Sequence, residues 1–167
     1  MFEGCVGLTQ VQELLATELA SSCYQGMFKD CTSLTQAPIL NAGLMKPSCY
    51  ANMFEGCSSL TETPDLSSLS LAVSCYANMF KGCTSLTKAS ELPASILAES
   101  CYQGMFDGCT SLENIPTLVA LVLVKSCYAR MFAGCAVKKV TSSNGLTVEA
   151  LDEDCYDEMF ENCGYLK

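Results

Sequence analysis

A 26-residue repeat runs through the whole chain and constrains its fold more than any other feature. The dipeptide Met-Phe begins at residues 1, 27, 53, 79, 105, 131 and 159, so the interval is 26 five times and then 28. Cys-Tyr precedes each later Met-Phe, and a second Cys follows each Met by four residues. These two columns contain all 13 cysteines. Such a chain predicts a solenoid, in which each unit buries its apolar face against the next.

The spacing inside one unit separates an expected helical segment from an expected strand. Cys49, Met53 and Cys57 are spaced i, i+4 and i+8, which predicts a short helix with these side chains on its inward face. The glycine before the second Cys fits the end of that helix, where a positive φ favours glycine. The segment 60–66 then predicts a strand that its proline keeps short, because proline cannot donate a ladder hydrogen bond. The return segment should close the core with Leu19, Met45, Leu71, Leu97, Leu123 and Leu151, and residues 142–145 of the longer interval predict an inserted turn.

Four clean copies of the unit carry a resemblance to a known family. Two of them read CYQGMFKDCTSLTQAPIL from Cys23 and CYANMFEGCSSLTETPDL from Cys49. The block (A/M)-F-x-x-C-x-x-L, followed by a strand with proline, resembles the BspA-like, or Treponema-type, leucine-rich repeats of bacterial surface proteins. The resemblance covers essentially the whole chain. It implies an α/β repeat solenoid, a right-handed leucine-rich-repeat coil with short β-strands on one wall and short helical turns on the other.

On this basis we expect residues 1–167 to form a single array of about six 26-residue units, belonging to a longer protein. Met1-Phe2 already occupies the Met-Phe position of the repeat, and polar capping repeats, which solenoids need for solubility, are missing or weak at the two ends. Either the chain is a piece of a longer array, or its ends stack on other copies.

Composition weighs against several classes of function. The chain has no His and a formal net charge of -9, which disfavours His-based catalysis and binding to nucleic acid. The longest apolar run, 118–124, is far shorter than the roughly 20 residues that span a bilayer. No signal-peptide pattern opens this chain. We therefore expect no enzyme activity, no cofactor, no nucleic-acid partner and no membrane insertion.

The cysteines have several interpretations. Two Cys of one unit are eight residues apart, about 12 Å on a helix, whereas a disulfide needs Cα atoms within about 7 Å. Cys residues of neighbouring units would lie within that range, yet each has equivalent partners above and below. Buried free thiols are therefore the leading interpretation, and partial disulfide pairing is the alternative. The absence of His and of any C-x-x-C pair weighs against a metal site or a catalytic thiol.

Two columns of changeable residues are the candidate ligand-binding surface. The residues nine and twelve positions after each Met differ from copy to copy, although the rest of the unit repeats. Both positions flank the expected strand, so we expect them to face outward from the concave wall. The alternative is an ordinary solvated surface. The candidates are Gln10, Glu13, Gln36, Ile39, Glu62, Asp65, Lys88, Glu91, Asn114 and Thr117.

Two further features have open alternatives. Asp154, Asp157, Glu158 and Glu161 would form one helical stripe, read either as a calcium site or, preferably, as the solvated face of a helix. In the apolar run 118–124, Val119 and Leu121 indicate either a contact with another chain or local repacking of the core.

The leading functional hypothesis is a non-enzymatic recognition or adhesion module of a bacterial surface or secreted protein. By resemblance, its ligand is a protein or glycan on a host or neighbouring cell. The alternative is a structural spacer or self-assembling segment of a surface protein or fibre, with contacts end to end or through Val119 and Leu121. A third hypothesis assigns a thiol or metal function to the Cys columns.

Overall fold

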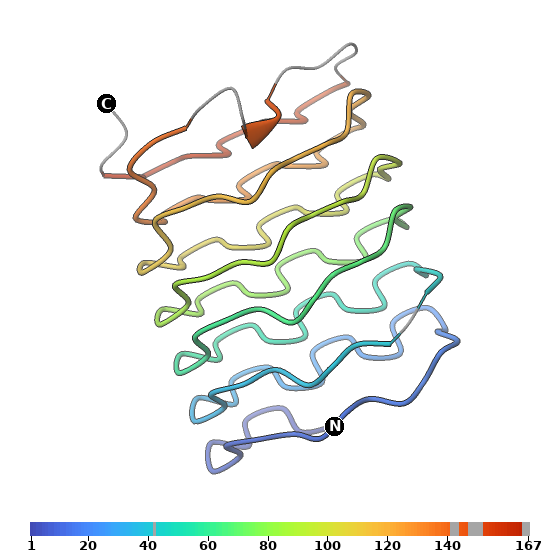
Figure 1. Ribbon diagram of the computed structural model, residues 1–167, viewed down its shortest axis with the longest axis vertical. Helices are drawn as coiled ribbons and strands as arrows, with labels where there is room; N and C mark the ends of the chain where they lie inside the picture. The colour runs from blue at the N-terminus through green and yellow to red at the C-terminus, as the bar shows by residue number, and fades with distance from the viewer. Residues whose placement is uncertain (42, 141–143, 147–151, 165–167) are drawn as a thin grey trace.

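The computed structural model describes residues 1–41, 43–140, 144–146 and 152–164. Figure 1 shows successive coils of the chain stacked one on another, each with a front and a rear segment. Each unit starts with a run of turns on one wall, which we call the turn wall, and returns along the other, the bridge wall. We number the coils by these runs: coil 1 is 1–20, coil 2 is 21–46, coil 3 is 47–72, coil 4 is 73–98, coil 5 is 99–124, coil 6 is 125–152 and coil 7 is 153–167.

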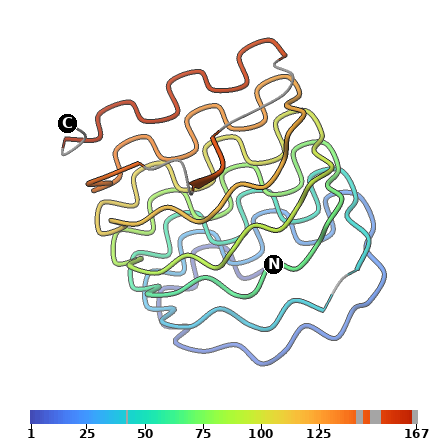
Figure 2. The ribbon, with the colours of Figure 1, turned by 45° about the horizontal axis from the view of Figure 1, so that its top comes forward.

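The turn wall consists of consecutive tight turns, and the described residues contain no α-helix. Turns run without interruption over 21–30, 47–56, 73–82, 99–108, 125–134 and 153–162. Figure 2 shows the resulting zigzag of the backbone, repeated from coil to coil. The predicted short helices are therefore wrong for the described residues.

Hydrogen bonding explains why a helix does not form. In coil 3, every second N–H bonds within the coil to the carbonyl three residues before, as from Met53 to Tyr50 at 3.2 Å. The N–H groups between them bond to the next coil, as from Phe54 to Met79 at 2.9 Å. An α-helix would satisfy these groups within itself and leave none for a neighbour. The alternating pattern joins the coils through the backbone as well as through side chains.

The bonds between coils on the turn wall all run in one direction. Tyr24 N–H donates to the carbonyl of Cys49, and the N–H of the same peptide unit, on Tyr50, donates to Cys75, both at 3.0 Å. The same arrangement holds at five peptide units in each of coils 2 to 6, with N···O distances of 2.7–3.0 Å. Five parallel chains of hydrogen-bonded peptides therefore run through the stack, and every donor points toward coil 7.

Every fourth residue of the turn wall has a positive φ. In coil 3 these are Ser48, Asn52 and Gly56, with φ of 53°, 58° and 73°. A positive φ at the third position of a four-residue turn is the signature of a type II turn, which favours Gly and Asn there. The predicted positive φ of the glycine is confirmed, although it belongs to a turn in place of a helix end.

The core consists of ladders of identical side chains. Cys, Met and Phe point inward as predicted, and Phe28, Phe54 and Phe80 have no exposed surface. Phe rings of consecutive coils stack with centroids 5.5–5.7 Å apart, and Tyr rings do so at 5.7–5.9 Å. Nearly parallel rings at this separation are offset, which is the favourable geometry for aromatic pairs. A fully buried Phe contributes about 2–3 kcal/mol by removal of apolar surface from water.

The bridge wall has less regular pairing than the predicted strands. Parallel pairing among the described residues is limited to isolated bridges, which join Leu14 to Leu40, Glu62 to Lys88, Ser70 to Ile96 and Leu92 to Leu118. Pro38, Pro64 and Pro116 are buried in this wall, where each removes a donor from the ladder. Leu19, Leu71 and Leu123 are buried, while Met45 and Leu97 pack against the core partly buried. Leu151 lies outside the described residues.

Coil 6, which is longer than the others, is hydrogen-bonded to coil 5 where the two backbones lie very close together. Leu118 N–H donates to Asn144 O at 2.9 Å, and Asn144 Nδ2 donates to Ile115 O at 3.2 Å. Gly145 has a φ of 75°, and a Cβ there would lie 1.7 Å from the carbonyl oxygen of Leu118. Only glycine fits this position. Residues 142 and 143 of the predicted turn insertion lie outside the described part of the chain.

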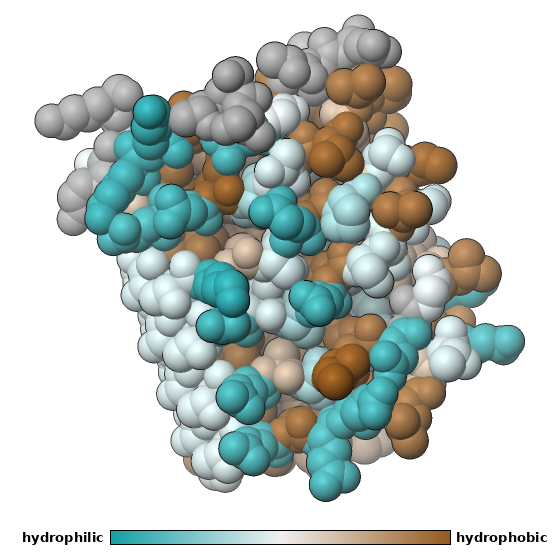
Figure 3. Space-filling model, viewed as in Figure 1, coloured by the Kyte–Doolittle hydropathy of each residue, from teal (hydrophilic) through white to brown (hydrophobic). Residues whose placement is uncertain are grey.

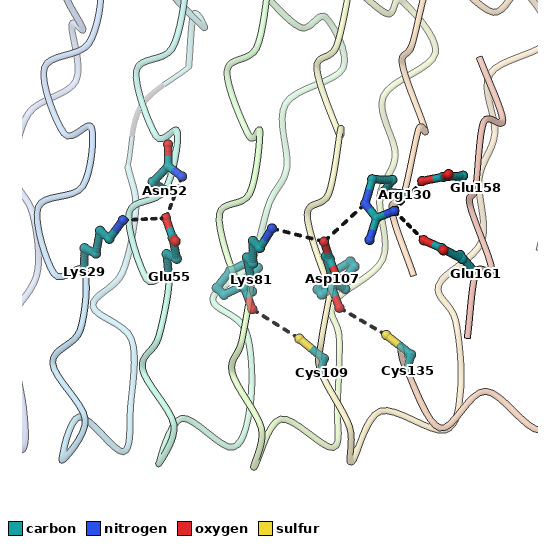
Figure 4. Close-up of polar contacts among 12 residues, drawn as sticks. Lys29, Asn52, Glu55, Lys81, Asp107, Cys109, Arg130, Cys135, Glu158 and Glu161 are labelled. Atoms are coloured by element: carbon teal, nitrogen blue, oxygen red, sulfur yellow. Dashed lines mark hydrogen bonds and ion pairs between the residues drawn. The ribbon is translucent and has the colours of Figure 1, made fainter. Parts of the chain in front are cut away.

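Alternating charges connect the coils across the turn wall. Lys29 pairs with Glu55 of coil 3 at 3.1 Å, and Lys81 pairs with Asp107 of coil 5 at 3.2 Å (Figure 4). Coil 6 has Ala at the equivalent position, and Arg130 supplies the cation from three residues earlier. It contacts the carboxylates Asp107, Glu158 and Glu161.

Candidate functional site

The two predicted recognition columns lie on the bridge wall with exposed side chains. Nine of the ten residues are exposed, and Thr117 is half-buried. Neighbouring members of the columns touch at several points. Glu62 and Lys88 form both a backbone bridge and an ion pair of 3.2 Å, and the carboxylate of Glu91 accepts a hydrogen bond from Thr117 N–H at 3.0 Å. Glu13 accepts a hydrogen bond from Asn41.

Three adjoining hollows form a shallow groove across coils 2 to 4, which we call the wall groove. The first, of about 330 Å³, is lined by Thr35, Gln36, Ala37, Thr61, Glu62, Thr63 and Pro64. The second, of about 360 Å³, shares Ala37 and Pro64 and adds Pro38, Ile39, Leu40, Asn41, Asp65 and Ser67. The third, of about 340 Å³, shares Asp65 and Ser67 and adds Leu66, Ser90, Glu91 and Pro93.

Five of the ten candidates therefore line one surface, and five do not. Gln36, Ile39, Glu62, Asp65 and Glu91 belong to the wall groove. Gln10, Glu13, Lys88, Asn114 and Thr117 are absent from its lining. The groove could not be predicted from one column, because each hollow forms between two coils.

The wall groove offers hydrogen-bond acceptors and few cations. It contains the carboxylates of Glu62, Asp65 and Glu91, and Lys88 neutralises only the first of them. Threonine and serine hydroxyls lie between the carboxylates. Figure 3 shows this face, with hydrophilic side chains over its middle, pale side chains along the left and apolar side chains along the right. The chemistry suits a ligand that presents hydrogen-bond donors.

The sequence matches the model of one known protein family along the whole chain. The description that matches is "BspA type leucine rich repeat region", in six copies, over residues 1–104 and 47–167. The chain belongs to the BspA-type leucine-rich repeat family. Comparisons with curated proteins and with solved structures gave no match.

Membership of the BspA-type family confirms the predicted resemblance and a repeat solenoid. Repeats of this family are generally non-catalytic, and they are typical of surface or secreted proteins. Within the described residues, no helix is both long enough and apolar enough to cross a membrane.

The thiols of these BspA-type repeats are free and mostly enclosed. All 13 are free, and only Cys5 and Cys23, in the first two coils, are exposed. Thiols of the second column donate to the Phe carbonyl of the preceding coil, as from Cys109 to Phe80 and from Cys135 to Phe106, both at 3.1 Å (Figure 4). Burial raises the pKa of Cys135 to about 12 and that of Cys127 to about 11. A protonated thiol is a poor nucleophile and metal ligand, and the described residues contain no cluster of three potential metal ligands.

The acidic residues of coil 7 do not form a helical stripe. They lie in turns, where Asp154 and Glu158 have positive φ values of 54° and 49°. Glu158 and Glu161 are held by Arg130, and Glu153 pairs with Lys125 at 3.1 Å. The interpretation as a solvated helix is wrong, because the segment is not helical and part of its charge is paired.

The apolar run 118–124 divides between core and surface. Leu118, Ala120 and Leu123 are buried, which fits repacking of the core, while Val119 and Leu121 are exposed, which fits the contact hypothesis. Val122 is exposed beside them. Leu44, Leu69 and Ile96, in the return segments of coils 2, 3 and 4, are exposed aliphatic residues that the sequence analysis did not single out.

Proposed function

We propose that this chain is a non-enzymatic recognition module of a bacterial surface or secreted protein, which binds a protein or glycan on a host or neighbouring cell through its bridge wall. The observation that carries the proposal is that residues which change from coil to coil, namely Gln36, Ile39, Glu62, Asp65 and Glu91, lie together in the wall groove. The turn wall and core repeat almost unchanged. A repetitive scaffold with one variable, exposed and grooved face is the usual arrangement of a solenoid that binds a partner.

The polarity of the groove supports the same assignment. Carboxylates and hydroxyls accept hydrogen bonds from the hydroxyls of a glycan and from the amides or basic side chains of a protein. A net charge of -9 disfavours nucleic acid as the ligand.

The test is a binding screen of the chain against extracellular-matrix proteins and glycans, with two charge-reversed variants beside it. Lys88→Glu with Glu91→Lys changes the bridge wall without changing net charge. Lys29→Glu with Glu55→Lys reverses two charges of the turn wall, again without changing net charge. We expect the first variant to weaken binding about tenfold or more and the second to bind as the parent does. Equal affinity of the parent and the bridge-wall variant would refute the proposed surface.

A structural or self-assembling segment is the second candidate. It is favoured by the row of exposed aliphatic side chains at one corner of the stack. If the parent chain binds nothing in the whole screen, this structural function would be favoured over recognition.

A further inference from the structure

Exposed aliphatic side chains recur in a row of four consecutive coils where the bridge wall turns back toward the turn wall, although Ser70 is the residue bridged to Ile96. We call this row the aliphatic corner: Leu44 in coil 2, Leu69 in coil 3, Ile96 in coil 4, and Leu121 with Val122 in coil 5. Backbone bonds keep neighbouring members adjacent, since Ile96 N–H donates to the carbonyl of Leu69 at 3.2 Å. Figure 3 shows apolar side chains along the right of the face, where the coils turn back in Figure 1.

The row has the size of a contact surface. At roughly 60–120 Å² of apolar surface for each aliphatic side chain, five of them present on the order of 300–600 Å². The largest apolar patch of a typical monomer is of this size and often functional. Pairing two such rows would bury roughly 600–1,200 Å², which reaches the lower limit of about 1,000 Å² for a specific interface.

The two ends of the aliphatic corner have complementary shapes. Beside Leu44, a hollow of about 410 Å³ opens between coils 1 and 2, lined by Thr17, Glu18, Leu19, Gly43, Leu44 and Lys46. At the other end, coil 5 presents two exposed side chains, Leu121 and Val122, in place of one. The hollow and the protrusion lie three coils apart on the same row, so they cannot meet within one molecule.

We propose that the aliphatic corner is an interface between two copies of this chain, arranged antiparallel about a two-fold axis between coils 3 and 4. This arrangement places Leu121 and Val122 of each copy against the hollow beside Leu44 of the other. It places Leu69 of each copy against Ile96 of the other. Both copies have the same spacing between coils, so each exposed aliphatic side chain of one copy can face one of the other. This is the self-complementary contact of a two-fold dimer.

Charge also favours the antiparallel arrangement. Coil 7 contains Glu153, Asp154, Asp157, Glu158 and Glu161. Parallel copies would place these acidic groups side by side, whereas antiparallel copies keep them at opposite ends. The inference does not depend on the proposed recognition function, because the aliphatic corner contains no residue of the wall groove.

The first test measures mass by light scattering over protein concentrations from about 5 μM to about 1 mM. The parent should approach twice the monomer mass as its concentration rises. Ile96→Lys should weaken association by about a hundredfold, because a buried aliphatic contact worth about tenfold is lost twice in a two-fold interface. Ile39→Lys is the matched control, since both isoleucines are 62% exposed and both variants change the net charge equally. A strictly monomeric parent, or equal weakening by the two variants, would overturn the proposal.

The second test distinguishes the antiparallel from the parallel arrangement. Leu44→Lys and Leu121→Glu should each weaken the dimer when introduced alone. When both substitutions are combined in one chain, the ammonium at position 44 of each copy faces the carboxylate at position 121 of the other in an antiparallel dimer. Association should therefore recover. In a parallel dimer the double variant would meet like charges and recover nothing, and that result would refute the proposed axis.

Added salt should strengthen association of the parent, since it screens the repulsion between two acidic copies.

Discussion

Alkaline pH should unfold this protein sharply, because its core includes many thiols that have almost no access to water. Burial raises the pKa of Cys49 and of seven further thiols in coils 3 to 6. It reaches about 11 for Cys127 and about 12 for Cys57, Cys101 and Cys135, and it is also raised for Cys75, Cys83 and Cys109. In the unfolded chain the same thiols ionise near their ordinary pKa of 9.0.

The sign and the size of the effect follow from proton binding. Above pH 9 the unfolded state binds fewer protons than the folded state, so the free energy of unfolding falls as pH rises from 9 toward the raised pKa values. Between pH 8 and pH 10 each thiol removes on the order of 1 kcal/mol, and seven remove roughly 7–10 kcal/mol. That loss is comparable to the total stability of about 5–15 kcal/mol of a typical domain.

Urea unfolding at pH 7, 8, 9 and 10, under reducing conditions, measures this loss. Tyrosine fluorescence is the signal, since the chain has no Trp. We expect the urea midpoint to fall steeply above pH 9 and the fold to be lost near pH 10 without urea. The variant Cys5→Ser with Cys23→Ser is the control, because both thiols are exposed and their removal should leave the pH dependence unchanged. Equal midpoints at pH 7 and pH 10 would refute the reasoning, as would a folded protein whose thiolate absorbance shows most thiols ionised near pH 9.

Two further predictions concern stability. Gly145→Ala should lower the free energy of unfolding by about 2–4 kcal/mol, because it combines a positive φ with a clash against Leu118 O. Gly43→Ala, where a Cβ meets no atom within 4 Å, should change thermal stability little, and a similar loss at both positions would contradict the assignment. Arg130→Ala should cost about 1 kcal/mol at low salt and less at high salt, since its three ion pairs are partly exposed. Lys125→Ala removes a single exposed pair and should have the smaller effect in the same urea titration.

The sequence predicted which side chains form the core but not the backbone that positions them. Cys49, Met53 and Cys57 share one face in an α-helix of 3.6 residues per turn, and they also share one face in a series of turns with a period of four. The two structures differ at the residue directly before each of these, where Ser48 and Asn52 take positive φ values that a helix forbids. The recurrence of Ser, Asn and Gly at every fourth position was the available signal.

Surface features that depend on two coils were harder to predict. The exposure of Glu62 and Lys88 follows from their variability, and the structure confirms it. The wall groove depends on how far apart neighbouring coils lie, which no single unit encodes. The aliphatic corner follows one position of the 26-residue unit only in part. Leu44, Ile96 and Val122 share that position, but coil 3 has Ser70 there, and its exposed aliphatic residue is Leu69.

The one-way hydrogen bonds of the turn wall have an electrical consequence. Each peptide unit carries a dipole of about 3.5 D, and units aligned head to tail in a helix sum to about half an elementary charge at each end. The five peptide chains of this stack are aligned in the same sense, so the solenoid carries a macrodipole with its positive pole at coil 7. Asp154, Asp157, Glu158 and Glu161 lie at that pole. Their concentration there stabilises the direction of stacking, and the same acids placed in coil 1 would oppose it.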